Sequence, residues 1–180
     1  MNVDSLRIGP RSAATRRSTI IKWSLLVLVM IVALAVDLYT KHLAEQRLVL
    51  GETTEILPFF SLQRTQNTGV AFGLLRGGGP LIVAANVVAM LVVCFYVFLE
   101  RRPLVAGIAG GLIIGGSLGN LVQRMSGEGI VTDFMKFPYW PNFNMADVFL
   151  IVGIVVVFLG LVVETIRVYR LGRSETSERD

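Results

Sequence analysis

Two aspartates in the last third of this 180-residue chain, Asp133 and Asp147, are of the residue type that metal-free acid–base chemistry needs. Neighbouring carboxyl groups cannot both ionise cheaply, so they share a proton, and one can act as a base while the other acts as an acid. Such a pair can activate a water molecule for attack on a peptide carbonyl and then protonate the leaving amine. If the fold brings them together, the two aspartates predict peptide hydrolysis.

Each aspartate also has a plain structural explanation. Asn144-Met145-Ala146-Asp147 matches a capping box, in which Asn144 caps a helix and the carboxylate of Asp147 lies in the first turn. Asp133 is equally compatible with a solvated aspartate in a loop. The two residues alone therefore leave capping and catalysis open.

Further polar residues fall near the same ends of the apolar stretches. Asp37 and Lys41 are spaced i, i+4 in the order that favours an ion pair on one helix, so a structural role is expected. Asn120 and Arg124 end a later stretch, and the planar guanidinium of Arg124 suits carbonyl or phosphate oxygens. Polar groups at this depth of a membrane are costly unless they are paired or functional, so their convergence indicates a site.

Composition argues against several other kinds of site. One cysteine and one histidine cannot supply an internal disulfide or an ordinary zinc site, so no metal or other cofactor is expected. The net charge of +4 comes from arginines beside apolar segments, which indicates orientation in a membrane and not nucleic-acid binding.

The segment Gly115-Gly-Ser-Leu-Gly119 matches the GxSxG motif of serine hydrolases, but it lies inside an apolar stretch and has no histidine partner in reach. Glycines recur here every fourth residue, at Gly107, Gly111, Gly115 and Gly119. A row of glycines on one helix face predicts close packing against another helix.

The elements that must position these residues are membrane helices. The chain is 53% hydrophobic with a mean hydropathy of +0.65, and about 20 apolar residues suffice to cross a hydrocarbon core about 30 Å thick. The first apolar stretch is longer than the core of a secretory signal, which predicts an uncleaved anchor. An alternating run over 56–66 predicts a small sheet. The expected spans are Ile20–Tyr39, Leu81–Leu99, Leu104–Val122 and Ala146–Val163.

Basic residues predict how the spans are oriented. Most of the 17 lysines and arginines lie before the first span, in the turn after the second, or after the fourth, so both termini are expected in the cytoplasm. The predicted fold is a mainly α membrane protein, a four-transmembrane-helix bundle with a small extracytoplasmic β-sheet cradle. The expected parts are a basic cytoplasmic segment over 1–19, the four-span domain over 20–165 with the cradle at about 44–76, and a polar cytoplasmic tail over 166–180.

Five motifs follow one another along the chain: Asp37-Leu-Tyr-Thr-Lys41, Asn67-Thr-Gly-Val-Ala-Phe-Gly73, Gly115-Gly-Ser-Leu-Gly-Asn120 leading to Arg124, Val131-Thr-Asp133-Phe134, and Phe143-Asn-Met-Ala-Asp147. In this order they resemble the motifs of lipoprotein signal peptidase, also called signal peptidase II, over about residues 20–165. The resemblance implies a bacterial aspartyl endopeptidase that removes the signal peptide from prolipoproteins, cutting just before a cysteine that carries diacylglycerol.

The resemblance also assigns roles to residues. It makes Asp133 and Asp147 the catalytic pair and gives Asp37 and Lys41 a structural role. Substrate-binding or supporting roles fall to Asn67, Gly69, Asn120, Arg124 and Asn144. The partners expected are diacylglyceryl-modified prolipoproteins and membrane lipids, with no nucleic acid. The enzyme is expected to be a monomer in the bacterial cytoplasmic membrane, without a cofactor and with its active site at the outer surface.

Gln123 departs from the family pattern, because members commonly have an aspartate directly before the arginine of the third motif. A glutamine keeps hydrogen bonds but cannot form an ion pair with Arg124, which favours the main alternative, a non-catalytic membrane protein that binds a lipid or peptide. A small transporter is a third hypothesis, but Asn86 alone is strongly polar well inside a span. Because the aspartate pair is intact, activity is predicted.

Overall fold

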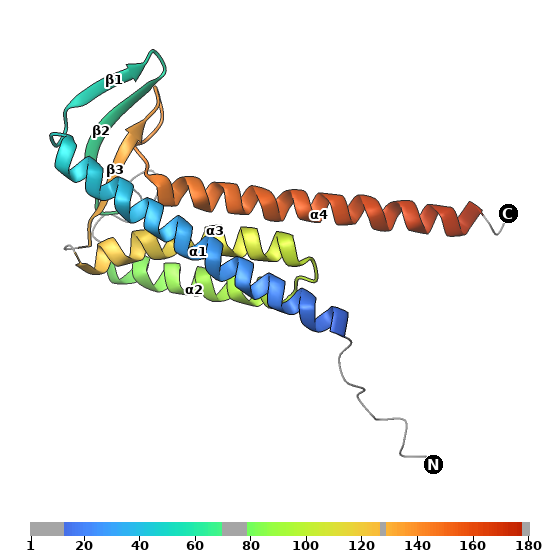
Figure 1. Ribbon diagram of the computed structural model, residues 1–180. Helices are drawn as coiled ribbons and strands as arrows, with labels where there is room; N and C mark the ends of the chain where they lie inside the picture. The colour runs from blue at the N-terminus through green and yellow to red at the C-terminus, as the bar shows by residue number, and fades with distance from the viewer. Residues whose placement is uncertain (1–12, 70–78, 127–128, 178–180) are drawn as a thin grey trace.

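The computed structural model describes residues 13–69, 79–126 and 129–177. Most of these residues form four helices that are long and apolar enough to cross a membrane. The helices run side by side, and a small sheet lies at the end where the first helix finishes and the fourth begins (Figure 1). The predicted four-helix architecture is therefore confirmed. The helices are α1 (Ala13–Arg47), α2 (Gly79–Leu99), α3 (Pro103–Ser126) and α4 (Met145–Ser177).

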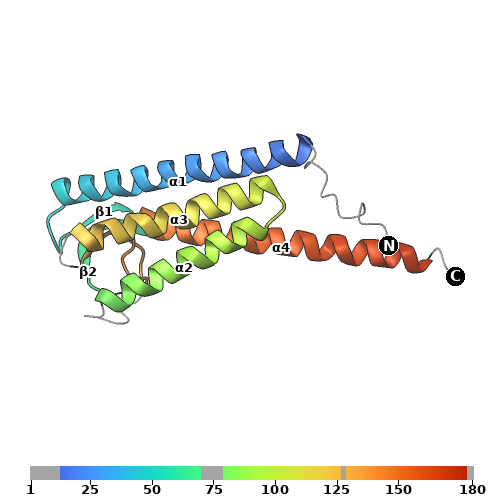
Figure 2. The same ribbon diagram turned by 90° about the horizontal axis from the view of Figure 1, so that it is seen from below.

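Helix α3 is the centre of the bundle and packs against each of the other three helices (Figure 2). Of its apolar stretch 72% is buried, against 11% in α1, 11% in α2 and 17% in α4. The outer three helices therefore expose most of their apolar side chains, as expected for surfaces that face lipid.

The glycine row on α3 faces α1, as the four-residue spacing predicts. A Cβ atom at Gly115 would lie 2.7 Å from the carbonyl oxygen of Met30 and 2.8 Å from the Cβ of Ala33. Other glycines serve the remaining helices, since a Cβ at Gly116 would lie 2.6 Å from the carbonyl oxygen of Ala146 in α4. The prediction of close helix packing is confirmed.

The end of the bundle away from the sheet is tied together by a lysine. Lys22 of α1 donates from Nζ to the carbonyl oxygens of Val97 (2.8 Å) and Glu100 (3.0 Å). The last carbonyls of a helix have no partner within it, so Lys22 satisfies the end of α2. The turn that follows is short, and α3 begins directly after it at Pro103, a residue suited to the first helical position.

The sheet has three antiparallel strands in the order β1 (Thr53–Leu57), β2 (Phe60–Asn67) and β3 (Val131–Lys136). β2 precedes the second helix, whereas β3 comes from the connection between α3 and α4. In the register of β2 and β3, Thr65 pairs with Asp133 and Asn67 pairs with Val131. The sheet therefore brings the Asn67 motif beside the Asp133 motif.

Several boundaries differ from those predicted, and α1 already begins at Ala13, inside the predicted basic segment. α1 continues to Arg47, so the first residues of the predicted cradle are helical, and the cradle also takes the strand 131–136 from outside 44–76. α4 continues to Ser177 through the predicted tail, because arginine and glutamate are good helix formers even where the apolar pattern has ended. Residues 70–73 of the second motif and 1–12 of the basic segment lie outside the described residues.

Candidate active site

Asp133 lies on β3 with a 3% exposed side chain, so it is not the solvated loop aspartate that the sequence also allowed. Its Oδ1 accepts a hydrogen bond from Nδ2 of Asn144 (2.6 Å), and its Oδ2 accepts one from Nδ2 of Asn67 (3.0 Å). Asn67 is itself held, because its Oδ1 accepts the backbone N–H of Gly69 (2.9 Å). Both oxygens of Asp133 are thus fixed by amide groups from two other motifs.

Asp147 lies in the first turn of α4 and forms the predicted capping box. Oδ1 of Asn144 accepts the N–H of Asp147 (3.2 Å), and Oδ2 of Asp147 accepts the N–H of Asn144 (3.1 Å). The remaining oxygen, Oδ1, accepts a hydrogen bond from Nδ2 of Asn120 (3.1 Å). Because Asn144 caps the helix and also binds Asp133, the cap is the means by which the two aspartates are held together. Capping and a chemical role are compatible here.

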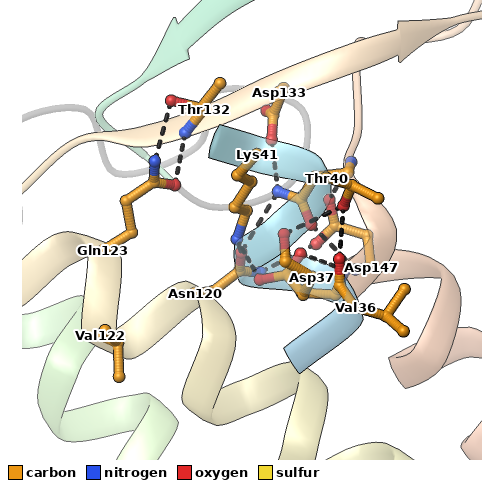
Figure 3. A network of polar contacts seen from close by, with 12 residues as sticks. Val36, Asp37, Thr40, Lys41, Asn120, Val122, Gln123, Thr132, Asp133 and Asp147 are labelled. Carbon is orange, nitrogen blue, oxygen red and sulfur yellow. Dashed lines mark hydrogen bonds and ion pairs between the residues drawn. The ribbon is translucent and has the colours of Figure 1, made fainter. Parts of the chain in front are cut away.

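Asp37 and Lys41 form the predicted ion pair, with 2.7 Å between Nζ and Oδ2, and both side chains are almost completely buried. Lys41 also donates to Oδ1 of Asn120 (2.7 Å), and Oδ1 of Asp37 accepts the N–H of Ala146 (2.8 Å). Figure 3 shows Lys41 between Asp37 and Asn120. Since Lys41 occupies the oxygen of Asn120, the amide nitrogen of Asn120 is directed to Asp147. Lys41, held by Asp37, therefore joins α1 to α3 through Asn120 and sets the orientation of a group that binds Asp147.

Arg124 completes the set of predicted residues. Its Nη2 donates to the carbonyl oxygen of Gly69 (2.9 Å), while its buried Nε has no hydrogen-bond partner among the described residues. Through this contact the structure joins all nine predicted site residues in one hydrogen-bonded network. In order of contact, the network runs Arg124, Gly69, Asn67, Asp133, Asn144, Asp147, Asn120, Lys41 and Asp37.

A cavity of about 790 Å³ opens beside this network. Asp133, Asp147 and Arg124 lie on its wall, together with Asn86 of α2. The rest of the lining is mainly apolar or aromatic, which suits an apolar ligand that presents one polar group to the aspartates. These lining residues include Ile82, Phe137, Trp140, Val148 and Ile151.

Burial raises the pKa of Asp133 from 3.8 to about 7, and the neighbouring charge of Asp147 contributes to the rise. Desolvation and a nearby like charge both disfavour the ionised form of a carboxyl group. The pair of aspartates therefore retains a proton close to neutral pH. A proton and an acceptor side by side are what general acid–base catalysis requires.

Gln123 binds neither aspartate. Its amide contacts Thr132, the residue before Asp133, and the carboxylate of Glu45 on α1. In the sequence, Gln123 is visible only as a departure from the third motif. Nothing marks Glu45, an ordinary polar residue 78 positions before Gln123, and the fourth motif contains Thr132 without indicating that it contacts Gln123.

Comparisons with known proteins agree on one family. The family model described as signal peptidase (SPase) II matches residues 29–163. A lipoprotein signal peptidase of Symbiobacterium thermophilum is 42% identical over 144 residues, which is 76% of this chain and 93% of that protein. One of Mesorhizobium japonicum is 40% identical over 73% of this chain and 81% of that protein.

Two solved structures share the fold. They are described as bacterial membrane enzymes determined by the in meso method, at 2.3 and 1.9 Å resolution. Their TM-scores are 0.72 and 0.68, each with 24% sequence identity. The first match covers 78% of this chain and 88% of that one, and the second covers 76% and 91%.

Proposed function

Because the chain belongs to the signal peptidase II family, we propose that it is a membrane aspartyl endopeptidase that cleaves the signal peptide from diacylglyceryl-modified prolipoproteins, just before the lipidated cysteine. One observation carries the proposal. Asp133, which is buried, and Asp147, which is partly buried, share one hydrogen-bonded network on the wall of a cavity that is otherwise mainly apolar. A signal peptide anchored by acyl chains is the kind of ligand that such a cavity suits.

We assign the shared proton of the resting enzyme to Asp133, whose pKa is raised to about 7. Asp147 takes a proton from water as the oxygen attacks the peptide carbonyl, and Asp133 gives its proton to the carbonyl oxygen. When the tetrahedral intermediate collapses, Asp147 protonates the leaving amine and Asp133 recovers a proton from the diol. Both aspartates thereby return to their starting states.

The supporting residues have distinct tasks in this proposal. Asn144 and Asn67 hold Asp133, whereas Asn120 and the capping box hold Asp147. Arg124 lies on the cavity wall, and its Nε–H has no partner within the described ranges, so it is suited to bind a substrate carbonyl oxygen. Positioning of this kind accounts for a large share of enzymatic rate enhancement.

The chain is a multi-pass membrane protein, and we propose that both termini lie in the cytoplasm with the site at the outer surface. The distribution of basic residues supports this orientation. The turn between α2 and α3, which contains Arg101 and Arg102, and the C-terminal part of α4, which contains Arg167, lie away from the sheet (Figure 1). A lipidated cysteine would then meet the aspartates at the depth of the lipid headgroups. One chain supplies the whole network, which supports a monomeric enzyme. The relatives described above are lipoprotein signal peptidases, so they do not favour the alternative of a non-catalytic lipid- or peptide-binding protein.

The test is a gel-shift assay of the purified protein in detergent, with a diacylglyceryl-modified preprolipoprotein and the same substrate unmodified. The parent is expected to cleave only the lipidated form. Asp133→Asn and Asp147→Asn are expected to lose about 10²–10⁴-fold in rate, the usual contribution of a general acid or base. Asp147→Asn should remain folded, because asparagine also caps helices well.

The matched control is Glu55→Gln, which makes the same chemical change on the exposed strand β1 and is expected to keep the parent rate. Cleavage at the parent rate by both aspartate variants would refute the catalytic assignment. Failure of well-folded parent protein to cleave the lipidated substrate would refute the proposed function.

A further inference from the structure

Gln123 is the centre of a second polar cluster, which we name the Gln123 clamp and define as Gln123 of α3, Thr132 of β3 and Glu45 of α1. Oε1 of Gln123 accepts the backbone N–H of Thr132 (2.8 Å), and Nε2 donates to Oγ1 of Thr132 (2.9 Å) and to Oε1 of Glu45 (2.7 Å). The hydroxyl of Thr132 in turn donates to Oε1 of Glu45 (2.6 Å). Figure 3 shows the two contacts between Gln123 and Thr132.

The chemistry of these groups fixes the direction of every bond in the clamp. A backbone N–H can only donate, so the amide oxygen of Gln123 must face Thr132. The amide nitrogen is then directed to Glu45, and an ionised carboxylate can only accept. An acid at position 123 could accept the N–H of Thr132, but it would offer no donor to Glu45 and would place two carboxylates in contact. The amide at position 123 is therefore matched to the acid at position 45.

The clamp holds the backbone directly before Asp133. Successive side chains of a strand point to opposite faces, so Thr132 faces α1 and α3 while Asp133 faces Asn67 and Asn144. Pairing of β3 with β2 is irregular on one side of this point, between Leu62 and Thr65. Directly after Asp133 the strand is held by Phe143, whose carbonyl oxygen accepts the N–H groups of Phe134 (3.0 Å) and Met135 (2.9 Å). Directly before Asp133 the clamp attaches the strand to two helices, so Asp133 is held from both sides.

We propose that Gln123 and Glu45 are positioning residues, which act through Thr132 to hold the carboxyl group of Asp133 in its place beside Asp147. Gln123 is then a residue paired with Glu45 and not a defect in the third motif. Among the described residues it makes no hydrogen bond to Arg124. This inference rests on the proposed peptidase function, because it concerns the geometry of the same two aspartates.

The experiment exchanges the amide and the acid of the clamp. In Gln123→Glu, two carboxylates meet at the clamp, and we expect kcat at pH 7 to fall about 10–100-fold with little change in KM, since displacing a catalytic group by about 1 Å can cost 10²-fold. The defect should shrink as the pH falls, because protonating either carboxyl group restores a donor. Adding Glu45→Gln to Gln123→Glu should restore kcat to within about 3-fold of the parent, since the amide and the acid have exchanged places.

The matched control is Gln46→Glu, which adds the same charge to the neighbouring residue of α1, outside the clamp, and should keep the parent kcat. A double variant no faster than Gln123→Glu alone would overturn the proposal. So would a folded Gln123→Glu protein that keeps the parent kcat, or whose defect does not depend on pH.

Hydrogen–deuterium exchange separates this inference from the peptidase proposal. The amide of Thr132 is expected to be protected in the parent, to exchange faster in Gln123→Glu and to regain protection in the double variant. This readout needs no substrate, so it tests the clamp even if the parent does not cleave lipidated preprolipoprotein. Unchanged protection in Gln123→Glu would overturn the clamp while leaving the function of the aspartates intact.

Discussion

On the side of α3 that faces α1, the two helices pack closely and Asp37 and Lys41 form a buried ion pair. On the side that lines the cavity, the described residues leave space and hydrogen-bonding capacity open. The first side has glycines in van der Waals contact with α1 and the Asp37–Lys41 ion pair. The second side borders about 790 Å³ of cavity, in which Nε of Arg124 and Oδ1 of Asn86 are buried without a partner in the described part of the chain.

The difference separates scaffold from binding surface. A buried polar group that stays unsatisfied costs about 1–3 kcal/mol of folding free energy. Because the fold satisfies such groups on the α1 side of α3 and not on the cavity side, we expect a ligand to supply the missing hydrogen bonds in the cavity. Asn120 joins the two sides, because its oxygen accepts from Lys41 of the scaffold and its nitrogen donates to Asp147. Four experiments test this difference between the two sides of α3.

Lys41→Met should have the largest effect, because it leaves the carboxylate of Asp37 buried without its counter-ion. Breaking a buried ion pair by removing one partner costs about 3–5 kcal/mol of unfolding free energy. Cleavage should also be lost, since Asn120 is no longer oriented. The measurements are thermal unfolding in detergent and the gel-shift assay.

The double variant Asp37→Leu with Lys41→Met separates the two effects. Replacing both charges by apolar groups should recover most of the stability, as it does for other buried pairs, but should not recover cleavage. If the double variant cleaves at the parent rate, Lys41 does not orient the site and the division into scaffold and binding surface fails at Asn120.

Gly115→Ala should come next in size. The added Cβ would lie 2.7 Å from a backbone oxygen of Met30, which cannot move aside without shifting α1. Overpacking costs about 1–3 kcal/mol. Gly107→Ala is the milder comparison on the same face, because there the three nearest atoms to the added Cβ are side-chain atoms of Leu25, each at 3.0 Å, and none is a backbone atom. Equal losses of thermal stability in the two variants would contradict the account of tight packing.

The pH dependence tests the cavity side. With the pKa of Asp133 raised to about 7, kcat/KM should fall as the pH rises through 7, approaching tenfold per pH unit as the acid loses its proton.

The folded state also holds this proton after the unfolded chain has lost it, so the free energy of unfolding should decline between pH 3.8 and about 7. Asp133→Asn should remove that part of the decline. A pH-independent kcat/KM between pH 6 and 9 would exclude Asp133 as the acid.

The scaffold side could be predicted from sequence because its signals are local. The Asp37–Lys41 pair follows from an i, i+4 spacing, the capping box of Asp147 from four consecutive residues, and the glycine row from a repeat of four. Apolar length alone predicts the four spans. Each of these patterns lies within one helix, where sequence spacing and spatial neighbourhood correspond directly.

The cavity side depends on pairings between distant segments, which sequence spacing does not encode. The strand 131–136 was not predicted, although it brings Asp133 beside Asn67, because its partner strand lies in another connection. Glu45 and Gln123 belong to different helices, and they contact each other both directly and through Thr132. The family resemblance indicated which residues share a site but not the contacts that hold them there.

Asn86→Leu should have the smallest effect and the opposite sign from the scaffold variants. Oδ1 of Asn86 is buried beside the cavity without a partner among the described residues, so an apolar side chain of similar size should raise the unfolding free energy by about 1 kcal/mol. Val87→Leu, on the exposed face of the same helix, should change stability by less than about 0.5 kcal/mol.

If the open polar atoms serve the substrate, the stabilised Asn86→Leu variant should cleave with a lower kcat/KM than the parent. A variant that gains stability and keeps the parent kcat/KM would show that Asn86 is merely tolerated at the cavity, and the argument from unsatisfied groups would then rest on Arg124 alone.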